Sequence, residues 1–185
     1  MKLRKIFFTS LVSAIFSLLY ITAWAALPSN MWIEGANQGS IEGSSQTQGR
    51  EGSIDVYAFG HSLAIPTDVN SGRPTGQRIH KPFKILKTFD KSSPKLYQAL
   101  VTGEPLIKVE IKFYRINPDQ QQEHYFTVKL ESAIITNISP SMPTTLLQAN
   151  EAYRHMETVS FTYQKITWTW LPDGVETIDT WGEPR

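Results

Sequence analysis

The side chains in this sequence that could carry out nucleophilic catalysis are few and lie far apart. His61 and Ser62 are neighbours, and Asp68 follows in the same segment. A Ser-His-Asp site needs an imidazole that takes the hydroxyl proton and a carboxylate that holds the imidazole in place. Neighbouring residues of a strand point to opposite faces of a sheet, so His61 and Ser62 are not expected to converge. We therefore expect no enzyme activity, with a hydrolase assembled from distant residues as the alternative.

Sequence motifs that bind metals, nucleotides or phosphates are absent. The chain has no G-x-S-x-G, Walker A, G-x-G-x-x-G or H-E-x-x-H pattern. It has no cysteine, which excludes disulfides, thiol catalysis and cysteine-ligated metals. The histidines have spacings that match no short metal motif: His61, His80, His124 and His155. We expect no metal and no cofactor.

The distribution of charge argues against nucleic acid as a partner. The formal net charge is +1, but Lys2, Arg4 and Lys5 lie in the first 25 residues, which contain no acidic residue. Without these three cations the remaining chain carries a net charge of −2. Phosphate backbones are bound by basic surfaces, so we expect no nucleic-acid binding.

The first 25 residues have the pattern of a hydrophobic leader. A basic start, MKLRK, precedes the uncharged stretch IFFTSLVSAIFSLLYITAWA, and Ala23-Trp24-Ala25 matches a signal-peptidase site. This pattern predicts cleavage before Ala26. Two alternatives stay open: an uncleaved membrane anchor, because the apolar stretch is almost long enough to span a bilayer, and a true start at Met31. Residues 1–25 are the only expected contact with a membrane.

Apolar and polar residues alternate along most of the chain after Asn30, which is typical of strands buried on one face. The alternation is clear in segments 54–58, 82–89, 108–113 and 124–130. In residues 157–170 the apolar set changes from odd positions, ending at Tyr163, to even positions, starting at Ile166. Such a change of phase predicts a bulge or a strand that bends from one sheet into another. We predict a mainly β, antiparallel fold that is either a closed barrel or a sandwich.

One segment, KSSPKLYQALVTGEP, has helical spacing instead. Ser93 suits the N-cap, Pro94 the first helical position and Gly103 the C-terminal end. The segment has two stripes: an apolar one, formed by Leu96, Tyr97, Leu100 and Val101, and a polar one, formed by Lys95, Gln98 and Thr102. We predict one short helix that flanks the barrel and shows its polar stripe to solvent.

A loop rich in proline and glycine, residues 66–77, interrupts the predicted strands. A two-residue turn would join the flanking strands with much less chain. Long loops in compact domains are usually functional or disordered, so this loop is a candidate functional segment.

Six segments of the sequence follow one another in an order that is found in a known family. They are REGSIDVYAFGHSLAIPTD, GQRIHKPFKI, DKSSPKLYQALVTGE, VEIKFYRIN, QEHYFTVKLESAIITNISP and ETVSFTYQKITWTW. In these segments the chain resembles the haemolysin-coregulated proteins (Hcp), the tube subunits of bacterial type VI secretion. The resemblance runs from about Ala26 to Trp181, so residues 26–185 are interpreted as one Hcp-like domain.

The resemblance implies a two-sheet barrel with one helix, assembled as a hexameric ring that stacks into a hollow tube. It implies that the long loop contacts the neighbouring ring, with Pro66, Thr67, Asp68, Arg73 and Gln77 as the candidate residues. It also implies that the helix faces the lumen, where Lys95, Gln98 and Thr102 would meet cargo.

The implied partners are further copies of the chain, the sheath, the spike protein and small effector proteins. The implied route is secretion through the type VI apparatus. The leader departs from the family pattern, because family members generally lack one, and it raises periplasmic export or anchoring in the inner membrane as alternatives.

A function of a different class stays open beside this one. The chain would then be a monomeric β-sandwich that binds a ligand, for instance a glycan, on Trp168 and Trp170, which share one face of a strand. The size of the protein in solution separates the two functions, because a binding module stays monomeric whereas a tube subunit forms rings.

Overall fold

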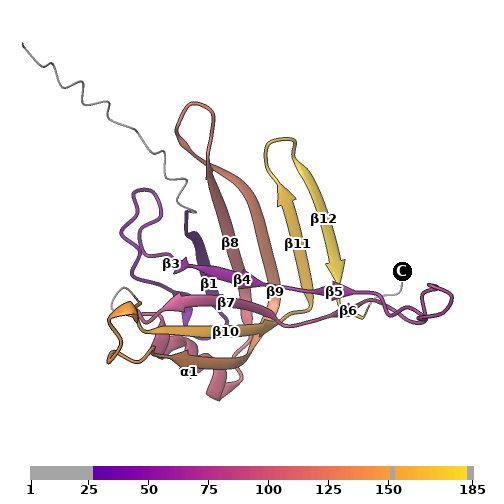
Figure 1. The fold of residues 1–185 in the computed structure, drawn as a ribbon, viewed down its shortest axis with the longest axis horizontal. Coiled ribbons are helices and arrows are strands. Elements are labelled where there is room, and N and C mark those ends of the chain that lie inside the picture. The colour runs from indigo at the N-terminus through magenta and orange to yellow at the C-terminus, as the bar shows by residue number, and fades with distance from the viewer. Residues whose placement is uncertain (1–26, 151–152, 183–185) are drawn as a thin grey trace, which may run out of the picture.

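The computed structural model describes residues 27–150 and 153–182 of the chain (Figure 1). The predicted leader, residues 1–25, lies outside the described residues. In chain order the elements are β1 (Ser29–Gly35), β2 (Gly39–Ile41), β3 (Ile54–Val56), β4 (Ala58–Gly60), β5 (Leu63–Ala64), β6 (Ile79–His80), β7 (Phe83–Thr88), α1 (Ser93–Thr102), β8 (Leu106–Ile116), β9 (Gln122–Ser141), the 3-10 turn η1 (Gln148–Asn150), β10 (Met156–Thr162), β11 (Lys165–Trp170) and β12 (Val175–Thr180).

The strands form two antiparallel layers that share the long strand β9. The first half of β9 pairs with β8 and β11, and these continue to β1, β2 and β12. The second half of β9 pairs with β10, followed by β7 and β4. In Figure 1 the layer with β8, β9, β11 and β12 stands upright, and β4, β7 and β10 run across it. This arrangement confirms the predicted antiparallel two-sheet fold.

The path of paired strands does not close into a complete barrel, although a barrel was predicted. It ends at β2 on one side and at β4 on the other. Segment 54–60 connects the two layers on this side, because β3 pairs with β1 and β4 pairs with β7. Tyr57 separates β3 from β4, and its backbone N–H donates to the carbonyl of Leu86 at 2.8 Å. The architecture is therefore barrel-like with an open sheet.

The change of phase in residues 157–170 marks the passage between the two layers. β10 belongs to the layer with β7, whereas β11 pairs with the first half of β9 and with β12. Val159, Phe161 and Tyr163 are buried before the break, and Ile166 is buried after it. The chain therefore bends from one sheet into the other at residues 163–164, which confirms the second of the two structures that the pattern predicted.

The hydrophobic core lies between the layers and follows the predicted alternation. Its largest members are fully buried aliphatic and aromatic side chains from both sheets and from α1: Phe83, Phe161, Met31, Ile41, Ile54, Ile85, Leu96, Leu106, Ile111, Leu130 and Ile166. Burying such side chains is the main favourable contribution to folding. Ala58 differs from the prediction, because it is exposed although Ile54 and Val56 are buried.

The helix α1 forms where the sequence predicts it and ends at Gly103, which has the left-handed φ of 65°. Its start and its buried stripe differ from the prediction. The N-cap is Ser92, so Ser93 is the first helical residue. Leu96 and Ala99 are the buried apolar residues, while Val101 is 78% exposed, because it lies too far around the helix from Leu96 to reach the sheet. Within the described part of the chain, no helix combines the length and apolar content needed to cross a membrane.

Candidate functional site

The segment that was predicted as a loop is an ordered hairpin that projects from the domain. β5 and β6 pair only with each other in the described strand ladders, and a single bridge joins Thr67 to Pro74 nearer the tip. In Figure 1 this hairpin extends away from both layers, beside the end of β12. The extra residues therefore let the hairpin extend away from the domain, whereas a two-residue turn would have kept the connection close to the sheet.

The tip of the hairpin is held by Asp68. Its Oδ1 accepts hydrogen bonds from the N–H of Asn70 at 3.1 Å, the N–H of Ser71 at 2.8 Å and the hydroxyl of Ser71 at 2.8 Å. These bonds, those of Ser71 first, lower the pKa of Asp68. Gly72 supplies the positive φ of 66° that the turn requires. Asp68 thus stabilises the turn at the tip of the hairpin.

The predicted stacking residues lie on this hairpin with different degrees of exposure. Thr67, Arg73 and Gln77 are exposed, whereas Pro66 and Asp68 are half-buried. The hairpin also exposes four large apolar side chains that the sequence analysis did not select: Leu63, Ile65, Val69 and Ile79. Val69 at the tip is 94% exposed, so it makes almost no contact within its own chain. An exposed apolar group of this kind is typical of a surface that contacts another molecule.

The base of the hairpin is fastened to β12 through Arg78. Its Nε donates to Asp179 Oδ2 at 2.6 Å and its Nη2 to the backbone carbonyl of Thr180 at 3.0 Å, with a second contact to Asp179 Oδ1. Burial raises the pKa of Asp179, but the hydrogen bond and charge of Arg78, together with His80, outweigh it and leave the pKa lowered. Asp179 is therefore a carboxylate at neutral pH.

Two histidines and a tyrosine continue this contact into the domain. His80 Nε2 lies 3.0 Å from Asp179 Oδ2, and His80 Nδ1 lies 2.8 Å from the Tyr163 hydroxyl. The same hydroxyl is 2.7 Å from His61 Nε2. His80 and Tyr163 are buried, and Trp181 stacks on the His80 ring with centroids 5.1 Å apart. These residues join the hairpin to the β10–β11 bend and to the C-terminal strand.

Burial also sets the protonation of this group. Desolvation, followed by the nearby His80, lowers the pKa of His61 below 6.5. Burial, followed by the charge of Asp179, raises the pKa of Tyr163. At neutral pH His61 is therefore uncharged and Tyr163 keeps its proton.

The structure does not bring His61, Ser62 and Asp68 together. His61 contacts Tyr163, and Asp68 bonds to Asn70 and Ser71 at the far end of the hairpin. Ser62 is exposed, and its backbone carbonyl accepts from the N–H of Lys81 at 2.9 Å. Among the described residues, no three His, Asp or Glu side chains are placed to hold a metal ion.

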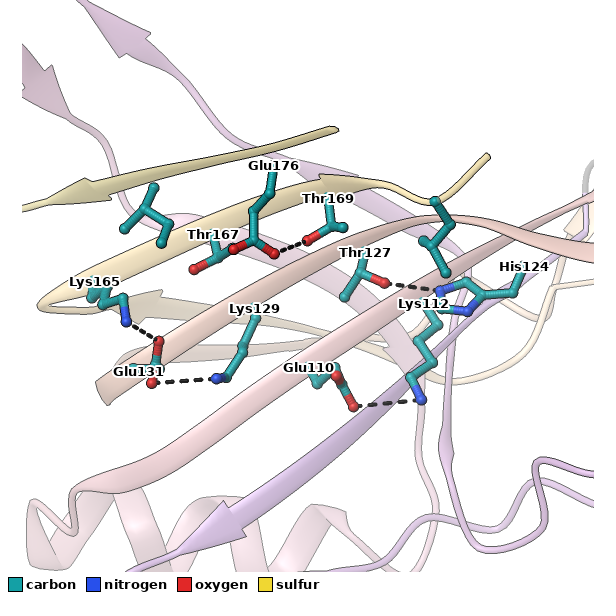
Figure 2. Close-up of a pocket in the computed structure, with 12 residues that line it drawn as sticks. Glu110, Lys112, His124, Thr127, Lys129, Glu131, Lys165, Thr167, Thr169 and Glu176 are labelled. Carbon is teal, nitrogen blue, oxygen red and sulfur yellow. Dashed lines mark hydrogen bonds and ion pairs between the residues drawn. The ribbon is translucent and has the colours of Figure 1, made fainter. Parts of the chain in front are cut away.

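A second surface is the polar face of β8, β9, β11 and β12, shown in Figure 2. It encloses a hollow of about 370 Å³. Lys165 and Lys129 contact Glu131 at 2.9 and 3.3 Å, and Glu110 contacts Lys112 at 3.6 Å. His124 Nε2 lies 2.9 Å from the Thr127 hydroxyl, and the Thr169 hydroxyl donates to Glu176 at 3.0 Å. Positive and negative side chains are thus paired on this face, so the face is hydrophilic and neither sign of charge predominates.

The predicted polar row on α1 is exposed, at Lys95, Gln98 and Thr102. The Lys95 ammonium donates to the carbonyl of Ser40 at 3.3 Å, and the Thr102 hydroxyl donates to the carbonyl of Gln98 at 2.8 Å. The row is therefore open to solvent along the helix, with one end near β2.

The two tryptophans of β11 do not form a shared flat platform. Trp168 packs against the core and lies 6.2 Å from the His61 ring. Trp170 meets Tyr125 edge to face, lies under Arg115 at 5.2 Å and donates from Nε1 to Asp173 at 3.0 Å. Both indoles are thus engaged within the chain, and the glycan-binding alternative gains no support.

The sequence analysis missed the contact between the hairpin base and β12. A signal was present, because Arg78 and His80 stand two residues apart and so share one side of a strand. Which residues they meet depends on how β6 approaches β12, and alternation of apolar and polar residues carries no information on that approach.

The fold and these surfaces define a class of protein. It is a mainly β, barrel-like subunit with an ordered arm that projects from the domain and exposes apolar side chains. Among the described residues, the side chains with nucleophilic chemistry are not assembled into a Ser-His-Asp site.

Comparison with known proteins identifies the family. The sequence pattern of the family described as "Type VI secretion system effector, Hcp" matches residues 31–170. The chain is 44% identical over 168 residues to a major exported protein of Pseudomonas aeruginosa, with 86% of this chain and 98% of that protein covered. The chain therefore belongs to the Hcp family of type VI secretion proteins.

Solved structures agree with this assignment. The chain is 40% identical to the Hcp1 protein of E. coli EAEC 042, with a TM-score of 0.75 over 84% of this chain and 99% of that one. It is 38% identical to the secreted protein Hcp3 of Pseudomonas aeruginosa, with a TM-score of 0.71 over 85% of this chain and all of that one.

Proposed function

We propose that this chain is a structural subunit of the type VI secretion tube, which closes into hexameric rings that stack through the projecting hairpin. The observation that carries the proposal is the ordered hairpin itself. It extends beyond its own domain and exposes Leu63, Ile65, Val69 and Ile79, which gain burial only against another molecule. Around them, Thr67, Arg73 and Gln77 supply polar contacts, Pro66 supplies a further apolar one, and Asp68 stabilises the turn at the tip.

The edges of the upright sheet support closure into a ring. β2 is the outer strand at one end of this sheet and β12 is the outer strand at the other. A cyclic ring needs two different surfaces on opposite sides of each subunit, so that each copy binds the next head to tail. Val175 and Ile178 on β12 are more than half exposed, and a neighbouring copy would cover them together with the unpaired strand edge.

Effectors are the proposed cargo of the tube, and Lys95, Gln98 and Thr102 are the proposed contacts for them. The exposed polar row on α1 suits a water-filled lumen. Because the chain resembles tube subunits, the proposed partners are further copies of the chain, the sheath and the spike protein. The chain leaves the cell through the type VI apparatus and acts without chemistry of its own.

The leader is the remaining part of the proposal. Cleavage before Ala26 would release residues 26–185 as one domain, and retention would place an anchor on each subunit of a ring. N-terminal sequencing of protein from the native cell distinguishes a start at Ala26 from starts at Met1 and Met31.

The experiment for the stacking role replaces residues 67–77 with an Asn-Gly turn, which matches the twist of a two-stranded hairpin. Because the removed residues lie outside the core, we expect folded rings that no longer form tubes. Circular dichroism, light scattering and electron microscopy measure fold, ring and tube. Tubes of normal length from the shortened protein, or loss of the fold, would contradict the proposed role of the hairpin.

A further inference from the structure

The hairpin has no backbone pairing with the main sheets in the described strand ladders, so side chains at its base set its direction. Arg78 and His80 reach Asp179 on β12, and His80 and His61 reach Tyr163 at the bend between β10 and β11. We name this group the clamp: His61, Tyr163, His80, Asp179 and Arg78. The clamp ties both strands of the hairpin base to two elements of the domain.

The hydrogen atoms of the clamp can be placed from its acceptors. A carboxylate accepts and does not donate, so the contact of His80 with Asp179 is attractive when Nε2 carries the hydrogen. In a neutral ring Nδ1 is then an acceptor and takes the hydroxyl hydrogen of Tyr163. The Tyr163 oxygen in turn accepts from His61 Nε2. His61 therefore donates to Tyr163 and Tyr163 donates to His80, whose Nε2 lies 3.0 Å from the carboxylate that Arg78 also holds.

We propose that the clamp fixes the direction of the projecting hairpin and that protonation of both its histidines releases the hairpin, so that stacked rings separate in acid. The consequence for stacking rests on the proposed function of the hairpin. The proposed roles of the clamp and of its protonation do not depend on that function, because they concern contacts within one chain.

The clamp accommodates one additional proton and fails with two. If His80 gains a proton on Nδ1, the Tyr163 hydroxyl turns to donate to His61 Nε2, and His61 carries its hydrogen on Nδ1 instead. A second proton, on His61, leaves the hydroxyl of Tyr163 with a donor on both sides and no acceptor. Tyr163 is 4% exposed, so water does not easily replace the lost acceptor.

The charges around the clamp also favour release of the hairpin when both histidines are protonated. With both histidines protonated, two cationic rings stand 6.4 Å apart beside Arg78, against the single carboxylate of Asp179. Phe83 and Trp168 also contact the His61 ring, at centroid distances of 5.4 and 6.2 Å, and carry no charge. The domain therefore contains one anion at this place to balance three cations.

The sign of the pH dependence follows from His61 and Asp179. The pKa of His61 is lower in the folded protein than its usual 6.5, so His61 stabilises the clamp above that pH and weakens it as the pH falls below. The lowered pKa of Asp179 means that its contribution disappears only in stronger acid, below 3.8. As the pH falls, the contribution of His61 is therefore lost before that of Asp179.

The test measures hydrogen exchange of backbone amides 63–79 in the full chain, at pH 7.5 and pH 5, after correction for the intrinsic effect of pH on exchange. A buried Tyr163 hydroxyl hydrogen without an acceptor predicts exchange about ten-fold faster at pH 5, or more, with β9 unchanged. Tyr163→Phe removes the shared hydroxyl and should give fast exchange at both pH values. Tyr125→Phe, at the far end of β9, should behave like the parent protein.

A double variant, His61→Gln with His80→Gln, keeps a donor and an acceptor at each position but cannot take up a proton in this range. We expect its exchange to be the same at both pH values, and its tubes to persist at pH 5 when those of the parent separate in sedimentation. Exchange in the parent that is equally slow at pH 7.5 and pH 5 would overturn the proposal, as would a double variant that is as acid-sensitive as the parent. If exchange accelerates as expected while tubes remain intact, the clamp stands and the stacking role of the hairpin fails.

Discussion

The ammonium group of Lys87 has no access to solvent, and four oxygen atoms surround it. Its Nζ lies 2.7 Å from Glu157 Oε1, 2.9 Å from Asp90 Oδ1, 3.0 Å from Ser93 Oγ and 2.8 Å from the carbonyl of Thr88. Lys87 and Glu157 are direct partners in the β7–β10 register, and both side chains are fully buried. This pair ties the start of α1 to the core of the domain.

Lys87→Met should lower the free energy of unfolding by about 3–5 kcal/mol, because it leaves the buried carboxylate of Glu157 without its cation. Denaturant titration measures the loss. Lys91→Met is the matched control: it breaks the exposed Lys91–Glu42 contact, which should cost less than about 1 kcal/mol. A double variant with Glu157→Leu should recover much of the stability, and equal losses for Lys87→Met and Lys91→Met would contradict this account.

At the scale of single residues the sequence carried part of this information. Lys87 follows Phe83 and Ile85 in the buried phase of its strand, and Glu157 precedes Val159 and Phe161 in the same way. A charge in a buried phase indicates that a partner exists. Its identity required the β7–β10 register, just as the partners of Arg78 and His80 required the position of β12.

At the scale of elements, Gly103 ends α1 with a φ that side chains with a Cβ avoid. Gly103→Ala should therefore lower the free energy of unfolding by about 1 kcal/mol. Gly60→Ala is the control, since Gly60 lacks the positive φ and has open space around its missing Cβ. Thermal unfolding compares the two, and an unaffected Gly103→Ala protein would show that the end of the helix is not constrained there.

The polar row of α1 is tested by its effect on cargo. Lys95→Glu reverses the charge at one end of the row, and a double change, Gln98→Trp with Thr102→Trp, adds bulk to the rest. If this face lines the lumen, both proteins should form normal rings that retain less of a co-expressed small effector, measured by co-purification. Val101→Gln, on a neighbouring exposed position, serves as the control. Undiminished retention in both altered proteins would mean that effectors do not contact this row.

The elements themselves were largely predictable, and the reasons are local. Alternation in 108–113 and 124–130 identified β8 and β9, and the change of phase after Tyr163 located the passage between the sheets. The hairpin at 63–80 was interpreted only as a loop of 66–77, because its short strands bury almost nothing and so leave no alternation. Val101 was misplaced because a helix of about two turns offers few positions from which to define its buried side.

At the scale of the whole molecule, strand order is the information that the sequence pattern lacked. Periodicity shows which residues of β9 face inward, but nothing in it shows that the strand pairs with β11 along one half and β10 along the other. The family resemblance supplied the two-sheet arrangement, and the open path between β2 and β4 appeared only in the structure.

The central claim is that the molecule works as a ring, and its mass in solution tests this claim most directly. The protein from residue 26 to 185 should have six times the subunit mass by light scattering, because closure covers β12, β2 and the apolar side chains near them. Electron microscopy of the same sample should show rings and, at higher concentration, stacks. A protein that stays monomeric from micromolar to millimolar concentration would contradict the account.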